Sequence, residues 1–153
     1  MGAGVWALKL QSVAKTYEAF DGALNAPEFT LGLVQFHDLT TRLTLASPAD
    51  VVLSLEVGEH LPAIYQDVFL DSLVNNARCW IVLSWAPPGA PGLGHVNELV
   101  NERVVELMRA RGWSQLVEVQ EAMRAAVHDQ TFFKKSLMVF GRPNGIQCGD
   151  AVV

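Results

Sequence analysis

The sequence predicts an α/β protein, a three-layer sandwich built on a mostly parallel sheet. Short apolar runs typical of buried strands, at 51–55 and 79–86, alternate with longer segments whose apolar residues recur at helical spacing. The chain has 153 residues, half of them hydrophobic and 18% charged, which suits one domain with a substantial core. We therefore expect one domain over 1–143, followed by a flexible tail over 144–153.

The elements of the first third follow from local patterns of apolar and turn-forming residues. In chain order they are a helix over 5–15, a strand over 17–22, a polar loop over 23–31, a strand over 33–37 and a strand over 51–55. The last of these is launched by the turn Ser47-Pro48-Ala49-Asp50. It is rich in Val and Leu, as a strand buried on both faces would be.

The rest of the chain continues the alternation of helices and strands. Pro62 fits the first turn of a helix, and Gly112 is placed to end one. We expect a helix over 62–77, a strand over 79–86, a Pro/Gly-rich loop over 87–94, a helix over 97–111, a strand over 113–119, a helix over 121–130 and a last strand over 136–140. The loop over 87–94 is a candidate lid or acceptor-binding loop.

Composition and charge exclude several classes of function. The net charge is −5 and no cluster of Lys and Arg is present, which argues against a nucleic-acid partner. No apolar run is long enough to span a membrane, and the N-terminus carries no secretory signal pattern. Two cysteines form neither a disulfide framework nor a zinc pattern, so we expect Cys79 to be a buried thiol and the compartment to be cytoplasmic. The oligomeric state is not defined by these features.

The strand over 51–55 ends in a cluster of polar residues. Glu56, Gly58, Glu59 and His60 follow it directly, before Pro62. Open α/β sheets place their ligands at the carboxyl ends of their strands. The cluster is therefore predicted to form the floor of an active site.

Two further groups point to a nucleotide-type ligand. Gly2 and Gly4 precede the first predicted helix, where glycines allow close approach of a ligand and the helix N-terminus attracts an anion. Asp21 ends the next strand, where a carboxylate can accept hydrogen bonds from ribose hydroxyls, although a turn residue before a glycine is the simpler role. Asp38 with Leu39 ends the following strand and can meet an adenine ring; an ordinary strand-end cap is its alternative.

The order of these motifs resembles the class I S-adenosylmethionine-dependent methyltransferases. More narrowly, the segments 54–62 (SLEVGEHLP), 83–86 (LSWA), 94–97 (GHVN) and 137–140 (LMVF) are similar to a subgroup of small uncharacterised methyltransferase domains. The resemblance covers Gly2 to about Arg142. It implies a Rossmann-like methyltransferase sheet, S-adenosylmethionine as the methyl donor, and transfer to an unidentified, small-molecule acceptor.

The resemblance also assigns positions to the donor. Gly2 and Gly4 match the glycine loop near the methionine part, and Asp21 matches the acid that binds the ribose. Asp38 and Leu39 match the pair beside the adenine, while Glu56 matches the end of the fourth strand beside the methionine. A catalytic base does not follow from the resemblance.

Candidates for that base follow from the chemistry of methyl transfer. The donor supplies the activated leaving group, but a hydroxyl or amine acceptor must also lose a proton, for which histidine is the natural base. His60 and His95 follow neighbouring strands, so we expect them to face one crevice, with Glu59 or Glu56 orienting an imidazole. Structural roles for both histidines remain open. His37 and His128 are expected outside the site.

The same groups permit a different hypothesis, a metal-dependent hydrolase. Carboxylates and imidazoles are ligands for divalent ions, and this set comprises Glu56, Glu59, His60, His95 and Glu98. No compact spacing such as H-E-x-x-H is present, so the sequence predicts no metal site. Trp85 is expected in the core, with the lining of a pocket as the alternative.

The chain departs from the family pattern at its start, where a strand should precede the glycine loop. In the family order this first, central strand lies between the strands that end in Asp21 and Glu56, so its absence exposes two apolar edges. We expect the natural chain to extend upstream of Met1; alternatively, the two halves pair directly, or another chain supplies the strand. The leading hypothesis is a small-molecule methyltransferase, and its alternative is an inactive methyltransferase-like binding domain.

Overall fold

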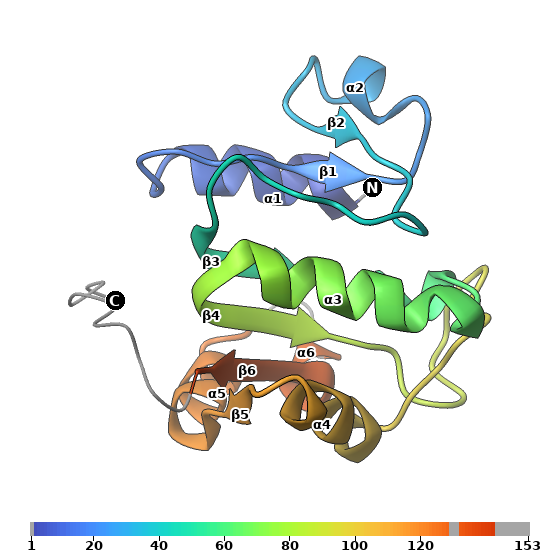
Figure 1. The fold of residues 1–153 in the computed structure, drawn as a ribbon, viewed down its shortest axis with the longest axis vertical. Helices are drawn as coiled ribbons and strands as arrows, with labels where there is room; N and C mark the ends of the chain where they lie inside the picture. The colour runs from blue at the N-terminus through green and yellow to red at the C-terminus, as the bar shows by residue number, and fades with distance from the viewer. Residues whose placement is uncertain (1, 129–131, 143–153) are drawn as a thin grey trace. The chain divides into compact units, whose positions relative to one another are not determined.

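The computed structural model describes residues 2–128 and 132–142 (Figure 1). The chain divides into two compact units, 1–43 and 44–153. The predicted tail over 144–153 lies outside the described residues.

The first unit contains two short helices and a two-stranded parallel sheet. Its elements are α1 (Gly2–Gln11), β1 (Phe20–Asp21), α2 (Ala26–Phe29) and β2 (Gln35–Phe36). Phe20 lies opposite Gln35 and Asp21 opposite Phe36, so both strands end at the same edge. The buried core of this unit consists of Ala7, Ala26 and Val34, with Tyr17, Ala19 and Leu33 packed against it.

Three predictions for this unit need correction. The helix expected over 5–15 begins at Gly2, so Gly2 and Gly4 lie in its first turn rather than in a loop before it. The strands expected over 17–22 and 33–37 are reduced to two residues each. The polar loop contains α2, which begins next to Pro27, a residue whose fixed φ favours the first turn of a helix.

The second unit is built on a four-stranded sheet. Its strands are β3 (Ala49–Ser54), β4 (Ala77–Ser84), β5 (Ser114–Gln115) and β6 (Leu137–Gly141), in the order β3-β4-β6-β5. β3 and β4 are parallel, while β6 is antiparallel to both β4 and β5. Three of the four strands therefore run in one direction, and the predicted class, α/β with a mostly parallel sheet, is confirmed.

Helices pack along this sheet (Figure 1). α3 (Gln66–Asn76) lies beside β3 and β4, and α4 (Asn101–Ala110) lies beside β5. α5 (Val117–Ala125) lies beside β6, and the short helix α6 (Phe133–Ser136) lies beside α5. Two 3-10 turns, η1 (Gly58–His60) and η2 (Ala63–Tyr65), separate β3 from α3. No helix in the described segments is both long enough and apolar enough to cross a bilayer.

The core of the second unit lies at the paired strands β4 and β6. Ile81 is opposite Phe140 and Leu83 is opposite Met138, and all four side chains are fully buried. Their continuous apolar runs are typical of strands covered on both faces. Burying side chains of this size contributes about 1.5–3 kcal/mol each, so this pair of strands anchors the loops that extend from β4.

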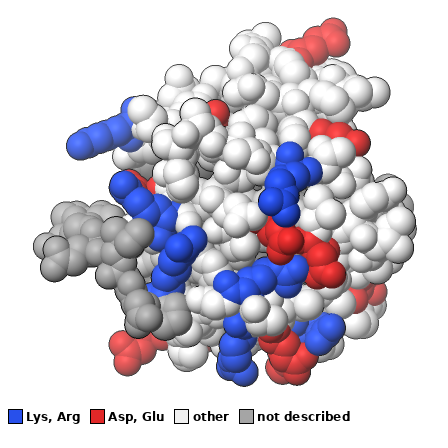
Figure 2. Space-filling model, viewed as in Figure 1, with Lys and Arg blue, Asp and Glu red and all other residues white. Residues whose placement is uncertain are grey.

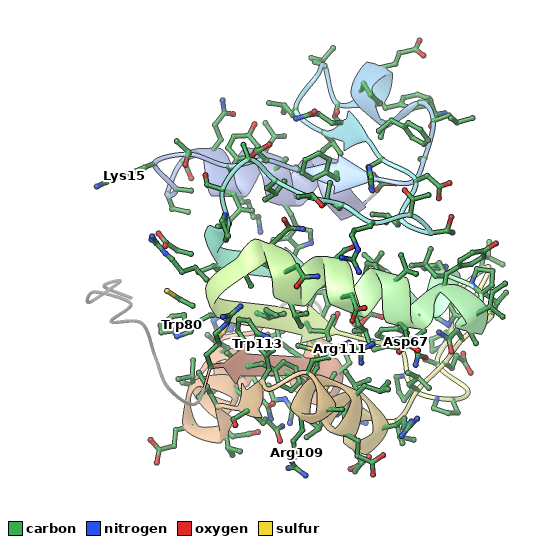
Figure 3. All side chains as sticks on the ribbon, viewed as in Figure 1. Lys15, Asp67, Trp80, Arg109, Arg111 and Trp113 are labelled. Carbon is green, nitrogen blue, oxygen red and sulfur yellow. The ribbon has the colours of Figure 1, made fainter. Side chains whose placement is uncertain are left out.

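Arg111, at the end of α4, joins that helix to α3. Its Nη2 donates to Asp67 Oδ1 at 2.6 Å and its Nε to Asp71 Oδ1 at 2.8 Å, and the guanidinium is largely buried. Figure 3 shows Arg111 beside Asp67, whereas Arg109 points away from the sheet. On the face drawn in Figure 2, basic and acidic side chains lie side by side. The ion pairs between Arg111 and α3 therefore hold α4, the helix that follows the β4–α4 connection, in a fixed position relative to α3.

The boundaries of several elements differ from those predicted. The helices expected over 62–77, 97–111 and 121–130 are α3, α4 and α5, and the strand expected over 113–119 is the two-residue β5 because α5 already begins at Val117. Cys79 is part of a disulfide bond, so the expectation of a free buried thiol is wrong. The other cysteine of the chain, Cys148, lies outside the described residues.

The strands that end in Asp21 and Glu56 belong to different sheets. Among the described residues β1 pairs with β2 and β3 pairs with β4, and β1 and β3 do not pair with each other. Direct pairing of the two halves, one of the three arrangements considered from the sequence, is therefore not observed. β3 forms one edge of its sheet.

Candidate functional site

Two loops of the second unit are joined through their main chains at the carboxyl ends of β3 and β4. We call residues 55–61 the β3 loop and residues 85–100 the β4 loop. The backbone N–H groups of Val96 and Asn97 both donate to the carbonyl oxygen of Glu59, at 2.8 and 3.1 Å. Since β3 and β4 are parallel neighbours, both loops leave the sheet at the same edge. The prediction that these loops meet is confirmed.

Gly58 and Trp85 pack tightly where the loops join. A Cβ atom at Gly58 would lie only 2.2 Å from Trp85 Cζ3, so no larger residue fits. Trp85 is fully buried, and its Nε1 donates to the carbonyl oxygen of Asn97 at 2.6 Å. Of its two expected roles, core packing is the one observed, and the indole holds the β4 loop close to β3.

His60 and His95 are brought together by this packing. Their ring centroids lie 5.0 Å apart with the planes at 70°. His60 Nδ1 lies 3.2 Å from the carbonyl oxygen of Gly94, and His95 Nδ1 lies 3.1 Å from Glu98 Oε1. Because both partners only accept hydrogen bonds, each Nδ1 donates, which leaves Nε2 of each ring with a lone pair.

Glu98 orients His95 and is itself held in place. Its Oε2 accepts a hydrogen bond from the backbone N–H of Gly89 at 2.9 Å. That N–H and the contact with His95 lower the pKa of Glu98, so the carboxylate is charged at neutral pH. From the sequence, Glu56 or Glu59 is the residue predicted to orient an imidazole. The spacing of His95 and Glu98, three residues apart, was the available signal.

Glu59 is the one acidic side chain that is fully buried among the described residues. Neither of its carboxylate oxygens has a hydrogen-bond partner. Burial, followed by the negative charge of Glu56, raises the pKa of Glu59 to about 7, while the neighbouring His95 acts in the opposite direction. A buried carboxyl without partners is costly to a fold, and such groups concentrate at functional sites.

Glu56, in the β3 loop, is hydrogen-bonded to one residue of β4 and one residue of α6. Its φ is 54°, a left-handed conformation that is unusual for a residue other than glycine. Its backbone N–H donates to Ser84 Oγ at 2.9 Å, and its Oε1 accepts from Ser136 Oγ at 3.3 Å. Strained backbone of this kind clusters at ligand sites. Ser136 lies too far away in the sequence to have been recognised.

The acids expected to bind the nucleoside lie in the first unit. Asp21 ends β1 and Asp38 follows the parallel strand β2, so both lie at the same edge of this sheet. Asp21 Oδ1 accepts from the N–H of Ala23 at 2.8 Å, and Asp38 Oδ1 accepts from the N–H and the hydroxyl of Thr40 at 3.0 and 2.6 Å. The Thr40 hydroxyl, its N–H and the charge of His37 lower the pKa of Asp38, which keeps it ionised. Both acids hold the turns that follow their strands.

Leu39 packs beside the first of these turns. A Cβ atom at Gly22 would lie 3.9 Å from Leu39 Cδ1, an ordinary contact distance. Leu39 thus brings the loop after β2 against the loop after β1, as a side chain beside a shared ligand would require. The roles of Asp21, Asp38, Leu39 and the two glycines toward a ligand stay predictions.

Solved structures with the same fold bind S-adenosylmethionine or its product. The 1,6-didemethyltoxoflavin-N1-methyltransferase of Burkholderia thailandensis, solved with 1,6-didemethyltoxoflavin and S-adenosylhomocysteine, matches 92% of this chain and 67% of its own at 14% identity and a TM-score of 0.59. The DhpI complex with S-adenosylhomocysteine matches 93% of this chain and 74% of its own at 18% identity and a TM-score of 0.55.

A third structure, LepI in complex with S-adenosylmethionine, matches 92% of this chain at 16% identity and a TM-score of 0.58. This chain covers only 41% of LepI. No protein-family model matches the sequence, and no curated protein matches it either. At these identities the likeness establishes the fold.

Proposed function

From the class I methyltransferase fold that this chain has, we propose that it binds S-adenosylmethionine and transfers the donor's methyl group to a small-molecule acceptor. The observation that carries the proposal is the match of 92–93% of the chain to structures solved with S-adenosylmethionine or S-adenosylhomocysteine. One of them also contains a small heterocyclic acceptor, 1,6-didemethyltoxoflavin. An inactive binding domain, the alternative from the sequence, finds no comparable support.

The donor-binding side is assigned to acids that follow parallel strands. In the first unit, Asp21 accepts hydrogen bonds from the ribose hydroxyls, and Asp38 and Leu39 flank the adenine. In the second unit, Glu56 is assigned to the methionine end by the resemblance. Gly2 and Gly4, in the first turn of α1, present backbone N–H groups that α1 leaves free. These assignments follow the resemblance, with the change that the glycines act from within the helix.

The acceptor side is assigned to the joined β3 and β4 loops. Methyl transfer is an in-line displacement at a sulfonium, so the protein mainly positions the acceptor and removes its proton. His95 is suited to that proton transfer because Glu98 holds its Nδ1–H and leaves Nε2 as the base. His60 is exposed and adjacent, and Glu59 supplies a carboxyl whose pKa of about 7 lies near the operating range of a base.

The donor half of this proposal is tested by titration calorimetry with S-adenosylhomocysteine. The wild-type chain is expected to bind it, and Asp21→Ala is expected to lose binding because the ribose hydroxyls lose their acceptor. Glu18→Ala, which removes an exposed acid three residues earlier, is the matched control and should bind like the wild type. A folded wild-type chain that does not bind the ligand would contradict the proposal.

The proposed roles of His95 and Glu98 are tested by an assay of methyl transfer. Because the acceptor is not identified, candidate acceptors are screened in that assay. Transfer of a labelled methyl group from S-adenosylmethionine to a panel of small alcohols, phenols and nitrogen heterocycles is the direct measurement. His95→Asn and Glu98→Gln are expected to lower the rate while leaving the affinity for S-adenosylhomocysteine unchanged. Equal rates in the wild type and in His95→Asn would remove His95 from the reaction.

A further inference from the structure

Three metal-ligating side chains converge where the β3 and β4 loops join. Glu59, His60 and His95 each offer one ligand atom, and these atoms all lie within 4.8 Å of one another. Protein ligands lie about 2 Å from a bound zinc ion. Small movements of the side chains therefore bring all three into contact with a single ion.

The unpaired carboxyl group of Glu59 is independent support for a cation at this position. Its side chain is fully buried, yet both of its oxygens lack a hydrogen-bond partner. Leaving a buried polar group unpaired costs about 1–3 kcal/mol, and a charged one more. A cation beside these two oxygens removes that cost, and the imidazoles of His60 and His95 are the nearest additional ligands.

The two histidines are already oriented as metal ligands usually are. A metal-binding imidazole generally donates its other N–H to a carbonyl or carboxylate, which fixes the ring and its tautomer. Here His60 Nδ1 donates to the carbonyl oxygen of Gly94, and His95 Nδ1 donates to the carboxylate of Glu98. Nε2 of each ring is left to bind an ion.

We propose that Glu59, His60 and His95 form a binding site for one divalent first-row transition-metal ion, with Glu98 and the Gly94 carbonyl orienting the two imidazoles. Two nitrogens and one carboxylate suit Zn²⁺ or Mn²⁺ better than Mg²⁺ or Ca²⁺, which prefer oxygen ligands. Three protein ligands leave a position open, as in catalytic zinc sites. An acceptor oxygen can occupy that position.

This site deepens the acceptor half of the proposed function. A bound cation lowers the pKa of an oxygen acid that it contacts, so the ion would favour a hydroxyl acceptor and take over from an imidazole the role of activating it. The two imidazoles would then act as ligands. The proton that the hydroxyl acceptor loses would pass to solvent water, as its oxygen–methyl bond forms and the donor's sulfur–methyl bond breaks. All of the site's residues lie in the second unit, and the test below needs neither the donor nor an acceptor. A chain that binds no metal therefore leaves methyl transfer with His95 as the base standing, and a chain that binds no donor leaves the metal site standing.

The test is calorimetric titration of the full-length chain, without a histidine tag and after removal of metal by a chelator. The expected result is one Zn²⁺ per chain, with weaker binding of Mn²⁺ and weaker still of Mg²⁺. The same stoichiometry with Co²⁺, followed by its visible absorption bands, reports nitrogen and oxygen ligands independently of heat. A folded chain that binds no Zn²⁺, or that binds Mg²⁺ as tightly, would overturn the proposal.

Single variants identify which of the four histidines of the chain bind the ion. His60 is exposed, so His60→Ala removes a ligand without opening the core and is expected to weaken Zn²⁺ binding by about 100-fold or more. Glu98→Gln is expected to weaken it by about 10-fold through loss of the oriented His95. His37→Ala and His128→Ala are the matched controls and should bind like the wild type. Equal affinity in the wild type and in His60→Ala would overturn the assignment.

The Glu59→Gln variant distinguishes two possible roles of Glu59, a metal ligand and a neutral buried acid with a structural role. Glutamine has the shape and the hydrogen-bonding groups of a protonated glutamate, so it preserves a purely structural role, but it is a poor metal ligand. The expected result is a folded variant whose Zn²⁺ affinity falls as far as that of His60→Ala. Unchanged affinity in Glu59→Gln would remove Glu59 from the site.

Discussion

His60 and His95 lie with ring centroids 5.0 Å apart, although each belongs to a loop after a different strand. Two backbone hydrogen bonds from the β4 loop to the carbonyl oxygen of Glu59 produce this proximity. The imidazole pair is thus a product of the parallel neighbours β3 and β4, and its geometry depends on how tightly their loops pack.

Gly58→Ala tests that packing. A Cβ atom would lie 2.2 Å from Trp85 Cζ3, and overpacking of this kind costs about 1–3 kcal/mol of unfolding free energy. Urea denaturation measures the loss. Gly22→Ala is the matched control, because its Cβ would meet neighbours at 3.9 Å, and it is expected to change stability little. If Gly58→Ala is as stable as this control, the packing of Gly58 on Trp85 is looser than described.

Replacing Trp85 by Phe should relieve the clash in the Gly58→Ala background. The benzo ring of the indole carries the atoms that a new Cβ would meet. The double variant is therefore expected to be more stable than the sum of the two single losses predicts, since residues in contact are not additive. Additive losses in the denaturation cycle would contradict a direct contact.

Glu59→Gln should alter the pH dependence of stability. The pKa of Glu59 is raised from 4.5 to about 7 in the folded state. Between these pH values the folded metal-free chain holds a proton that the unfolded chain has released, so the contribution of Glu59 to stability falls as pH rises through this window. Above pH 7 the metal-free variant is expected to be more stable than the wild type, by on the order of 2 to 3 kcal/mol.

Thermal unfolding of both proteins from pH 4 to 8, in the presence of a chelator, measures this difference. The effects of the other titrating groups, including Glu56 and His95 beside Glu59, are largely shared by the two proteins and drop out of the comparison. A constant difference in stability across this range would show that Glu59 titrates normally.

Glu56→Gly should weaken ligand binding without lowering the stability of the fold. The left-handed φ of 54° costs a non-glycine residue about 1 kcal/mol, which glycine does not incur. We expect an equal or higher unfolding free energy, together with weaker binding of S-adenosylhomocysteine. Leu31→Gly is the matched control, because Leu31 has a φ of 53° and is almost fully exposed. It should relieve the same strain and leave binding unchanged; weakened binding in both variants would contradict a role for the Glu56 carboxylate.

Arg111→Met should weaken the connection between α3 and α4. The change keeps the apolar stem but removes the bonds to Asp67, whose side chain is largely exposed, and to Asp71, which is partly exposed, so we expect a loss of about 1 kcal/mol. Added salt should reduce the difference from the wild type. Arg109→Met, on the outward side of α4, is the control with no expected loss. Equal stability of the two variants would show that the ion pairs contribute nothing.

The sequence predicts the buried strand β4 and the meeting of the loops for simple physical reasons. It is wrong about the strand over 51–55, which was expected to be buried on both faces but is the edge strand β3, with Val51 43% exposed. The apolar run over 79–86 marks β4 as a buried strand, and with β6 it forms the buried centre of the sheet. The rule that parallel strands present their carboxyl ends at one edge predicts that His60 and His95 approach each other. Both predictions use only local pattern and sheet topology.

The remaining features depend on interactions that no local pattern encodes. Glu98, rather than Glu56 or Glu59, holds His95 because side-chain packing decides which nearby carboxylate reaches the ring. The left-handed backbone of Glu56 is imposed by its bond to Ser84 and by the turn that follows, since glutamate has no preference for it. The four-residue helix α2 is too short to show an apolar period, and the start of α1 at Gly2 has no cap signal in the sequence that could mark it.

The bonds from Val96 and Asn97 to Glu59 involve only main-chain atoms. The spacing of the two loops is therefore insensitive to which side chains occupy positions 60 and 95. Mutational drift at these positions can change the chemistry of the crevice while its dimensions persist. For protein engineering, the same scaffold is expected to accept other donor pairs, such as two cysteines, at a distance already set by the backbone.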